Sequence, residues 1–265
     1  MNQIELEATA ELTQKQVDSY HDDGYLALDA LTTSDEVVRL RAIYDRLFEE
    51  RAGREVGDQL DLAGVGDGTG EAKLPQIVEP IKYAPELAEG YYRVNAFAIA
   101  RQLLGPATEY SGEHAIFKPA FIGPETPWHQ DEAYWDASFD HNSLSIWIPL
   151  QPATLENGCM WFVPKSHRAG VLPHHTIDHD PRIHGLEVDE VDKVSAASCP
   201  IPAGGCTIHS SRTLHYAGPN RSDAPRRAYI LVYRTPPMPN TEGRRFPWNE
   251  EKRTARRERA ARKAT

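Results

Sequence analysis

The chain changes character near residue 105, and this change limits the folds open to it. Before that point apolar residues recur at helical spacing, whereas from Thr108 onward they fall into short runs broken by Gly, Pro and Asn. Short runs rich in β-branched and aromatic residues are typical of strands. The sequence therefore predicts an all-β barrel or sandwich with a layer of helices packed against it.

The expected helices lie in the first part of the chain. Residues 13–16 and 33–36 both have the pattern of a capping box, in which a Thr hydroxyl accepts a free N–H of the first turn. A third helical pattern covers residues 85–104 and ends at Gly105-Pro106, because proline does not continue a helix. A short strand is expected at residues 24–28, between the first two helices.

The strand patterns of the second part predict the β core. They are His114–Lys118, Leu144–Leu150, Cys159–Val163, Cys206–His209 and Arg227–Tyr233. No tether rich in Ser, Gly or Pro separates the helices from these strands. We therefore expect a single domain over residues 1–251, with a helical layer at about 12–105 and a β core at about 108–236, followed by a basic tail at 252–265.

The charge balance bears on the partners of the protein. The net charge is −10, from 29 basic and 39 acidic residues, but residues 252–265 hold seven Lys or Arg and one Glu. The rest of the chain therefore carries 22 − 38 = −16, which disfavours nucleic acid as a partner. The tail could bind a polyanion, but a solvated, fraying helix is the simpler interpretation.

Neither a membrane span nor a secretory signal is expected. Apolar stretches are far shorter than the roughly 20 residues of a spanning helix, and the first residues lack the basic and apolar regions of a signal. Cys159, Cys199 and Cys206 form an odd, widely spaced set, which suggests neither disulfides nor a zinc site. A cytoplasmic location is therefore the expectation.

Six glycines between residues 53 and 70 predict a loop. A phosphate-binding loop would need Gly-Lys-Ser/Thr at the start of a helix, and a dinucleotide fingerprint would need a preceding strand. The segment has neither, so it is not interpreted as a nucleotide site.

Two histidines and an aspartate have the pattern of metal ligands. His129 and Asp131 are two residues apart, so on a strand both side chains would leave the same face. His215 follows at the end of another strand-like run, just before a turn. Two imidazoles and one carboxylate form the facial triad of non-haem Fe(II) oxygenases, which leaves three coordination positions open. An ordinary hydrogen-bonded His–Asp pair is the alternative.

Arg226 favours the metal-site hypothesis. It follows His215 by 11 residues, after a turn at residues 219–225, and starts an apolar strand. A planar guanidinium there can bind a carboxylate through two parallel hydrogen bonds. An α-keto acid that chelates iron through its keto oxygen and 1-carboxylate needs such an anchor for its distal carboxylate.

Three segments together resemble the phytanoyl-CoA dioxygenase family of Fe(II)/2-oxoglutarate oxygenases. They are Pro127–Asp131, Glu156–Arg168 and His215–Arg226. The similarity extends from about Leu12 to Pro236. It implies a mainly β fold, a double-stranded β-helix (jelly roll, cupin-like) with supporting N-terminal α-helices.

The resemblance also assigns roles to residues of this chain. His129, Asp131 and His215 correspond to the iron ligands, and Arg226 corresponds to the arginine that binds 2-oxoglutarate. The cofactors implied are Fe(II), 2-oxoglutarate as cosubstrate and O₂, with ascorbate as a supporting reductant. Because Asp131 retains the carboxylate, the resemblance argues against halogenation.

Further positions match the family less strictly. Trp147 falls where the family often has a tryptophan beside the cosubstrate, although a core indole explains it equally well. Lys73 and His114 resemble positions that approach the cosubstrate in some members. Lys165 stands where the family usually has Gly in a Pro-Gly-Ser-His turn, and Gly205-Cys206 where Gly-Asp is common. Neither departure touches the triad.

The other histidines are expected to be structural. The four between residues 174 and 184 lie in a polar, proline-broken segment, which suggests a surface loop rather than a second metal site. His209 precedes His215 by six residues and could lie near the iron, but the spacing to Arg226 favours His215 as the ligand. His167 belongs to a turn and is expected to order its backbone.

The implied activity is hydroxylation of an unactivated C–H bond of a small metabolite or natural product, with release of succinate and CO₂. Desaturation or ring chemistry could replace hydroxylation, and the acidic body makes an acyl-CoA substrate less attractive. Two alternatives stay open: a non-catalytic jelly-roll protein that binds a metal or small molecule, and a cupin-like metal-dependent hydrolase or isomerase. Residues that could line the pocket, besides the loop 169–195, are Trp128, Tyr134, Trp135 and Trp161.

Overall fold

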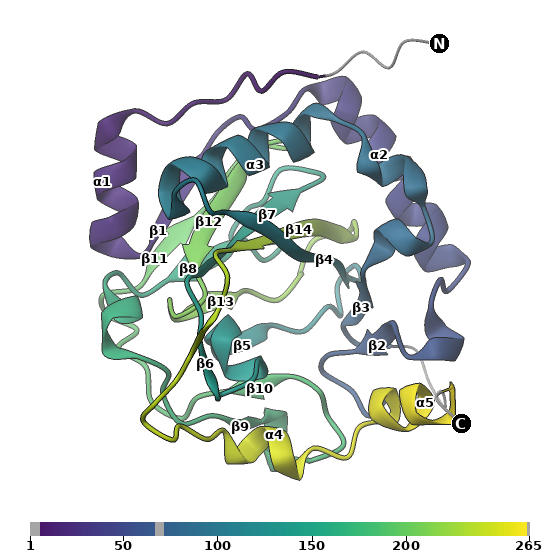
Figure 1. The fold of residues 1–265 in the computed structure, drawn as a ribbon. Coiled ribbons are helices and arrows are strands. Elements are labelled where there is room, and N and C mark those ends of the chain that lie inside the picture. Colours follow the sequence, from purple (N-terminus) through teal and green to yellow (C-terminus); the bar gives the residue numbers. More distant parts are fainter. Residues whose placement is uncertain (1–5, 67–71, 264–265) are drawn as a thin grey trace.

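Eight core strands form two antiparallel sheets that face each other in the computed structural model, which describes residues 6–66 and 72–263. The larger sheet has the order β1-β12-β7-β14-β4-β3-β2, and the smaller has the order β11-β8-β13-β5 (Figure 1). Strands β4, β7, β12 and β14 belong to the larger sheet and β5, β8, β11 and β13 to the smaller. Successive core strands change sheet at every step except from β8 to β11, which is the predicted jelly roll, and β1, β2 and β3 widen the larger sheet at its edges.

The predicted strands agree with the structure to within a few residues, except that β4 begins earlier, and β2, β3 and β11 were not predicted. The larger sheet consists of β1 (Tyr25–Leu28), β2 (Gln59–Asp61), β3 (Pro75–Val78), β4 (Glu109–Lys118), β7 (Ser143–Pro149), β12 (Cys206–Ser210) and β14 (Arg226–Arg234). The smaller consists of β5 (Thr126–His129), β8 (Met160–Phe162), β11 (Ala197–Cys199) and β13 (His215–Ala217). Two short pairs complete the strands: β6 (Phe139–Asp140) with β15 (Met238–Pro239), and β9 (His175–Thr176) with β10 (Leu186–Glu187).

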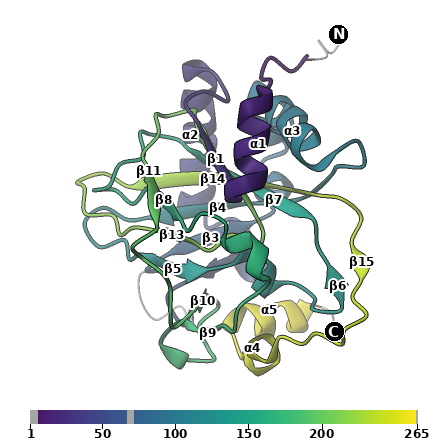
Figure 2. The same ribbon diagram turned by 90° about the vertical axis from the view of Figure 1, so that its left-hand side faces the viewer.

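Three helices cover the outer face of the larger sheet: α1 (Gln14–Asp23), α2 (Ser34–Glu49) and α3 (Tyr91–Leu104) (Figure 2). Their apolar residues form one core with outward side chains of the sheet such as Ile146 and Leu231. A second apolar cluster lies between the two sheets and contains Trp147 and Phe162. The helical layer and the β core are therefore held together by burial, as the sequence predicts.

The two predicted capping boxes have different outcomes. The first is complete: the Thr13 hydroxyl accepts the backbone N–H of Gln16, whose side chain accepts the N–H of Thr13. At the second, the Thr33 hydroxyl accepts the N–H of Glu36, but the Glu36 carboxylate instead accepts the N–H groups of Tyr91 and Tyr92. Glu36 therefore joins α2 to the start of α3.

Two expectations about the first hundred residues need correction. The third helix begins only at Tyr91, because a 3₁₀ helix, η3 (Pro85–Ala88), and a break precede it. The glycine-rich segment contains a 3₁₀ helix, η1 (Arg54–Val56), and strand β2, and its residues 67–70 lie outside the described part. The remaining 3₁₀ helices are η2 (Pro80–Lys82), η4 (Asp131–Tyr134), η5 (Ser166–Ala169) and η6 (Ile177–His179).

The C-terminal residues do not form the solvated tail expected from their charge. They fold into α4 (Pro247–Glu251) and α5 (Ala255–Lys263). Lys252 and Thr254 are buried, and the Arg259 guanidinium donates to the carbonyl of Gly66 at 3.0 Å. Lys252 and Arg259 therefore pack against the body of the protein, whereas Arg253 remains exposed. Among the described residues, no helix is long and apolar enough to cross a membrane.

Candidate active site

Strand pairing places the candidate residues in the space between the two sheets. In the larger sheet, Thr207, Trp147, Ile230 and His114 are consecutive cross-strand partners, so their side chains share a face. That face points toward the smaller sheet, in which β13 and β5 pair. Between the sheets lies a cavity of about 550 Å³. This cavity contains the predicted metal ligands.

The three predicted metal ligands converge at one point. His129 ends β5 and His215 begins β13, and the two are direct partners with ring centroids 4.2 Å apart. Oδ1 of Asp131 lies 3.8 Å from Nε2 of His129 and 3.5 Å from Nε2 of His215. One donor atom from each residue lies within 4.8 Å of the others, as a mononuclear metal site requires.

Asp131 reaches this point by a route that the sequence does not predict. Strand β5 ends at His129, and Asp131 is the first residue of η4. The expectation that both side chains leave one face of the same strand is therefore wrong. The 3₁₀ turn instead directs the carboxylate back toward the end of the strand.

Backbone carbonyls orient both imidazoles. Nδ1 of His129 lies 2.7 Å from the carbonyl of Pro127, and Nδ1 of His215 lies 2.9 Å from that of Thr213. Because a carbonyl oxygen only accepts, each Nδ1 carries the proton and each Nε2 presents a lone pair. Burial lowers the pKa of both histidines, that of His215 well below its usual value, and so favours the neutral form that a metal needs.

The second oxygen of Asp131 is held by two residues of the larger sheet. Oδ2 accepts the Ser145 hydroxyl at 2.6 Å and lies 3.3 Å from Nε2 of His209. Burial alone would raise the pKa of Asp131, but the imidazoles of His215 and His209 hold it well below its usual value. Asp131 is therefore ionised, with Oδ1 free to face the two histidines.

Arg226 carries an unsatisfied guanidinium in the same interior. It begins β14, is 1% exposed, and lies 5.4 Å from the centroid of the Trp147 ring. Its Nε and Nη1, and the hydroxyl of Thr207 on the other side of Trp147, are buried without a hydrogen-bond partner in the described part of the chain. Burial lowers the pKa of Arg226 to about 10, which leaves it charged at neutral pH. Such donors fit a carboxylate.

The Asn220 side chain stabilises the turn that precedes Arg226. Its side-chain amide donates to the carbonyls of Lys118, Pro119 and Ala224 at 3.2, 3.0 and 2.8 Å. The Lys118 ammonium is also buried, and it donates to the carbonyl of Ala217, the last residue of β13, and to that of Gly218, the next residue. The turn at residues 219–225 is therefore fixed from both sides.

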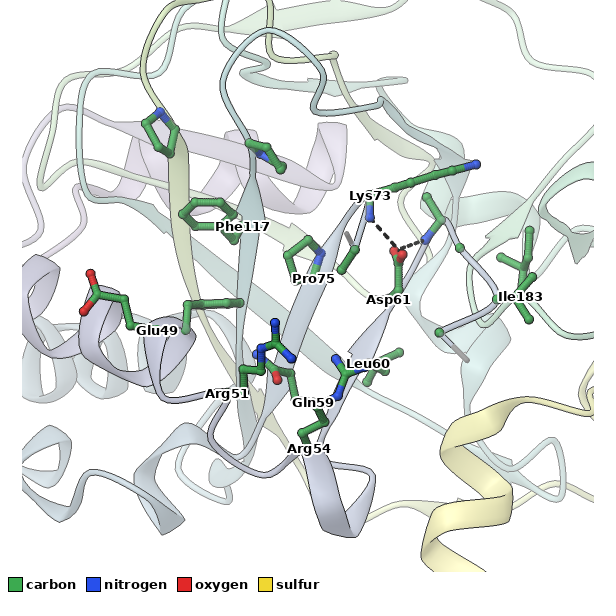
Figure 3. Close-up of a pocket in the computed structure, with 18 of the residues that line it drawn as sticks. Glu49, Arg51, Arg54, Gln59, Leu60, Asp61, Lys73, Pro75, Phe117 and Ile183 are labelled. Carbon is green, nitrogen blue, oxygen red and sulfur yellow. Dashed lines mark hydrogen bonds between the residues drawn. The ribbon is translucent and has the colours of Figure 1, made fainter. Parts of the chain in front are cut away.

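The remaining predicted cosubstrate residues separate into two groups. Trp147 and His114 line the cavity of the triad, and burial lowers the pKa of His114 to about 4. Lys73 does not reach the triad cavity, because its exposed side chain lines a second cavity of about 1180 Å³. There its backbone N–H donates to the Asp61 carboxylate (Figure 3). That larger cavity holds none of the triad, so Lys73 is not part of this site.

Two of the four suggested aromatic residues line the site. Tyr134 and Trp135 lie in the wall of the cavity. Trp128 and Trp161 instead belong to an apolar cluster on the far side of the smaller sheet, together with Leu214. Their alternation along the strands points them away from the larger sheet.

The histidine-rich segment is only partly the surface loop that was expected. His174 is buried and its Nε2 accepts the N–H of Gln130, and His184 lines the cavity beside Tyr134. His175 and His179 remain near the surface, where they stack with ring centroids 3.8 Å apart.

The two departures from the family pattern have local consequences only. Lys165 adopts the left-handed conformation, with φ of 66°, that its glycine counterpart would adopt without strain, and its ammonium lies 3.0 Å from Asp22. Cys206 is fully buried in the core beneath the helices. Neither residue contacts the triad.

Comparisons with known proteins agree with this geometry. Residues 20–228 match the family model of phytanoyl-CoA dioxygenase (PhyH). The crystal structure of EvdO2 from Micromonospora carbonacea var. aurantiaca, complexed with 2-oxoglutarate, is 39% identical, with a TM-score of 0.79 over 92% of this chain and 99% of that one. Phytanoyl-CoA dioxygenase domain-containing protein 1 of Danio rerio is 27% identical over 83% of this chain and 89% of its own length. A probable alpha-ketoglutarate-dependent hypophosphite dioxygenase of Stutzerimonas stutzeri is 24% identical over 81% and 76%. The chain belongs to the phytanoyl-CoA dioxygenase family of Fe(II)/2-oxoglutarate-dependent oxygenases, as its motifs predict.

Proposed function

We propose that the protein uses Fe(II), 2-oxoglutarate and O₂ to hydroxylate an unactivated C–H bond of a small metabolite or natural product, with release of succinate and CO₂. One observation carries the proposal. Three metal-donor atoms converge in a cavity that also holds a buried guanidinium with two unused donors.

The iron ligands in this proposal are Nε2 of His129, Nε2 of His215 and Oδ1 of Asp131. These donors suit Fe(II), and a facial set leaves three positions for the cosubstrate and O₂. When bound, the iron and 2-oxoglutarate supply the oxidising chemistry, while the protein supplies orientation and a dry site. Ser145 and His209 hold the far oxygen of Asp131, so they position the carboxylate without binding the metal.

Arg226 binds the distal carboxylate of 2-oxoglutarate in this proposal. Its guanidinium, beside the Trp147 ring, supplies the charge-assisted hydrogen bonds to that carboxylate. Trp147 and His114 form the walls between this anchor and the triad. The cosubstrate is thereby oriented with its keto acid end toward the metal ligands.

The size of the cavity supports a small substrate. About 550 Å³ must hold the cosubstrate and the substrate together, and pockets of this size accept small molecules. The related proteins named for hypophosphite and ectoine are named for small substrates. A cytoplasmic location is proposed because all three cysteines are buried free thiols, as in a reducing compartment.

The test is succinate release from 2-oxoglutarate with Fe(II) and ascorbate, over a metabolite panel and without it. We expect succinate in wild type and none in His129→Ala or Asp131→Ala, which should also lose Fe(II) binding. A hydrolase or isomerase would turn over its substrate with Zn²⁺ or Mn²⁺ and without succinate. A binding protein would take up 2-oxoglutarate and never form succinate. Either result would refute the proposal.

A further inference from the structure

The C-terminal segment forms part of the wall of the triad cavity. Its helices α4 and α5 lie on the opposite side of the molecule from α1–α3 (Figure 2). The side chains of Trp248 and Asn249 each donate to the carbonyl of Ala133 at 2.8 Å. Ala133 belongs to η4, the turn that begins with Asp131. The segment is therefore fastened to the element that positions the candidate aspartate.

Lys252 places a buried cation in this wall. It is 5% exposed and lines the same cavity as the triad. Its ammonium lies 4.6 Å from the centroid of the Tyr134 ring, which in turn meets the ring of His129 edge-on at 5.9 Å. Apart from this ring, no residue in the described ranges provides the ammonium with a hydrogen-bond acceptor or a carboxylate.

Two arginines add positive charge beside Lys252. Arg257 lines the cavity but is engaged, since its guanidinium donates to the carbonyls of Lys252 and Asn249 at 2.9 and 2.8 Å. Arg256 also lines the cavity, and its guanidinium has no hydrogen bond or ion pair to any described residue, although the Asp58 carboxylate attracts it from a longer distance. Burial, together with these arginines, lowers the pKa of Lys252 to about 7. A buried cation without a counter-charge is costly.

The acidic residues of the cavity do not balance this charge. Oδ1 and Oδ2 of Asp131 face the triad and its supporting residues. Glu113 is paired with Arg93, and Glu79 accepts the backbone N–H of Glu113 at 3.2 Å. The negative groups therefore belong to the triad and to the side formed by β3 and β4, whereas the C-terminal side is positive.

We propose that Lys252 and Arg256 bind an anionic oxygen group of the substrate, a carboxylate or a phosphate, and thereby direct the C–H bond to be oxidised toward the triad. The inference rests on the proposed function and specifies its substrate class. It assigns a second anion site, distinct from Arg226, because Lys252 lies against Tyr134 whereas Arg226 lies against Trp147. The basic C-terminal segment is thus a substrate-recognition element.

The first experiment titrates inorganic phosphate and, separately, acetate into protein loaded with Fe(II) and 2-oxoglutarate without oxygen, so that the cosubstrate occupies Arg226. Lys252→Met removes the charge and keeps the stem, Lys252→Arg keeps the charge, and Arg253→Gln is the matched control at an exposed neighbour. We expect at least one anion to bind wild type, Lys252→Arg and Arg253→Gln, and to bind Lys252→Met about tenfold more weakly or worse, as loss of a charged hydrogen bond predicts.

The second experiment measures succinate formation with matched carboxylates, phosphate monoesters and uncharged esters or alcohols. We expect either the carboxylates or the phosphate monoesters to stimulate succinate formation, and the class that does so identifies the anionic group of the substrate. Lys252→Met should then raise the KM for that substrate about tenfold and leave the KM for 2-oxoglutarate unchanged.

Three results would overturn the inference: no anion affinity that depends on Lys252, equal stimulation by the uncharged arm, or a Lys252→Met effect on the KM for 2-oxoglutarate alone. If wild type neither binds 2-oxoglutarate nor forms succinate, the proposed function fails instead. The anion titration, repeated without cofactors, then decides the Lys252 site by itself.

Discussion

Replacing Arg226 by methionine should have opposite effects on cosubstrate affinity and on the stability of the empty protein. The wild-type guanidinium has two buried donors, Nε and Nη1, without a described partner. If the guanidinium makes two charge-assisted hydrogen bonds of about 1.5–3 kcal/mol each to 2-oxoglutarate, their loss costs roughly 3–6 kcal/mol. The affinity for 2-oxoglutarate should then fall by about 10²- to 10⁴-fold.

The empty protein should gain rather than lose stability from the same change. Arg226 is 1% exposed and holds a charge that no described residue neutralises. Methionine fills similar space without the cost of burying that charge. Its Tm without ligand should therefore be equal to or above that of wild type, whereas the rise in Tm produced by saturating 2-oxoglutarate should disappear.

The assay is calorimetric titration of 2-oxoglutarate into Fe(II)-loaded protein without oxygen, with thermal unfolding of the same samples. Arg226→Lys serves as the control that keeps the charge but lacks the planar fork, and it should be intermediate in affinity. The reasoning is refuted if Arg226→Met binds 2-oxoglutarate within about threefold of wild type. It is also refuted if the empty variant loses as much stability as a truncation of the apolar core.

Three further changes test other contacts of the site. Ser145→Ala removes a hydrogen bond to Asp131, so the Fe(II) affinity in metal titrations should fall about 10-fold or more. The Fe(II)-loaded variant should keep its affinity for 2-oxoglutarate, and an unchanged Fe(II) affinity would contradict the role of Ser145. Asn220→Ala removes three hydrogen bonds in the turn and should lower the free energy of unfolding in urea by about 2–4 kcal/mol. A loss as small as that of the control Asp223→Ala, at an exposed position of the same turn, would count against it. The pKa of Lys252 is 10.5 in the unfolded chain and about 7 in the folded protein. Between these values the unfolded chain binds more protons, so the free energy of unfolding should rise with pH by up to about 1.4 kcal/mol per pH unit. Lys252→Met should remove this rise in urea unfolding at pH 7, 8 and 9, and a slope identical to that of wild type would disprove the assignment.

The triad and Arg226 could be predicted from the sequence because each lies at a local landmark. Strand β5 ends at His129 and β14 begins at Arg226, as predicted, whereas His215 begins β13 and does not end a strand. Their convergence is non-local, however, and followed only from the resemblance to a known family. By itself, the spacing of His129 and Asp131 favours an ordinary hydrogen-bonded pair, and Arg226 is the residue that favours a metal site.

The supporting residues carry no local signal. Ser145 and Thr207 are ordinary small polar residues within strand patterns. Only the pairing of β7 with β12 places them beside His209 and Trp147. The burial of the C-terminal segment has no local signal for a related reason. Its composition predicts a solvated helix, but a buried lysine is decided by what packs around it, here Tyr134 and the cavity wall.

Register in the larger sheet is the physical condition on which the whole site depends. Successive side chains of a strand alternate between faces, so Arg226, Ala228 and Ile230 share the inner face, and Tyr229 and Leu231 pack beneath the helices. A slip of one residue in β14 would bury Arg226 among the helices and direct two large core side chains into the cavity. The apolar residues of the outer face therefore select the register, and through it they place the guanidinium on the side of the triad. Selection for a stable core and selection for a working site act on the same strand pairing.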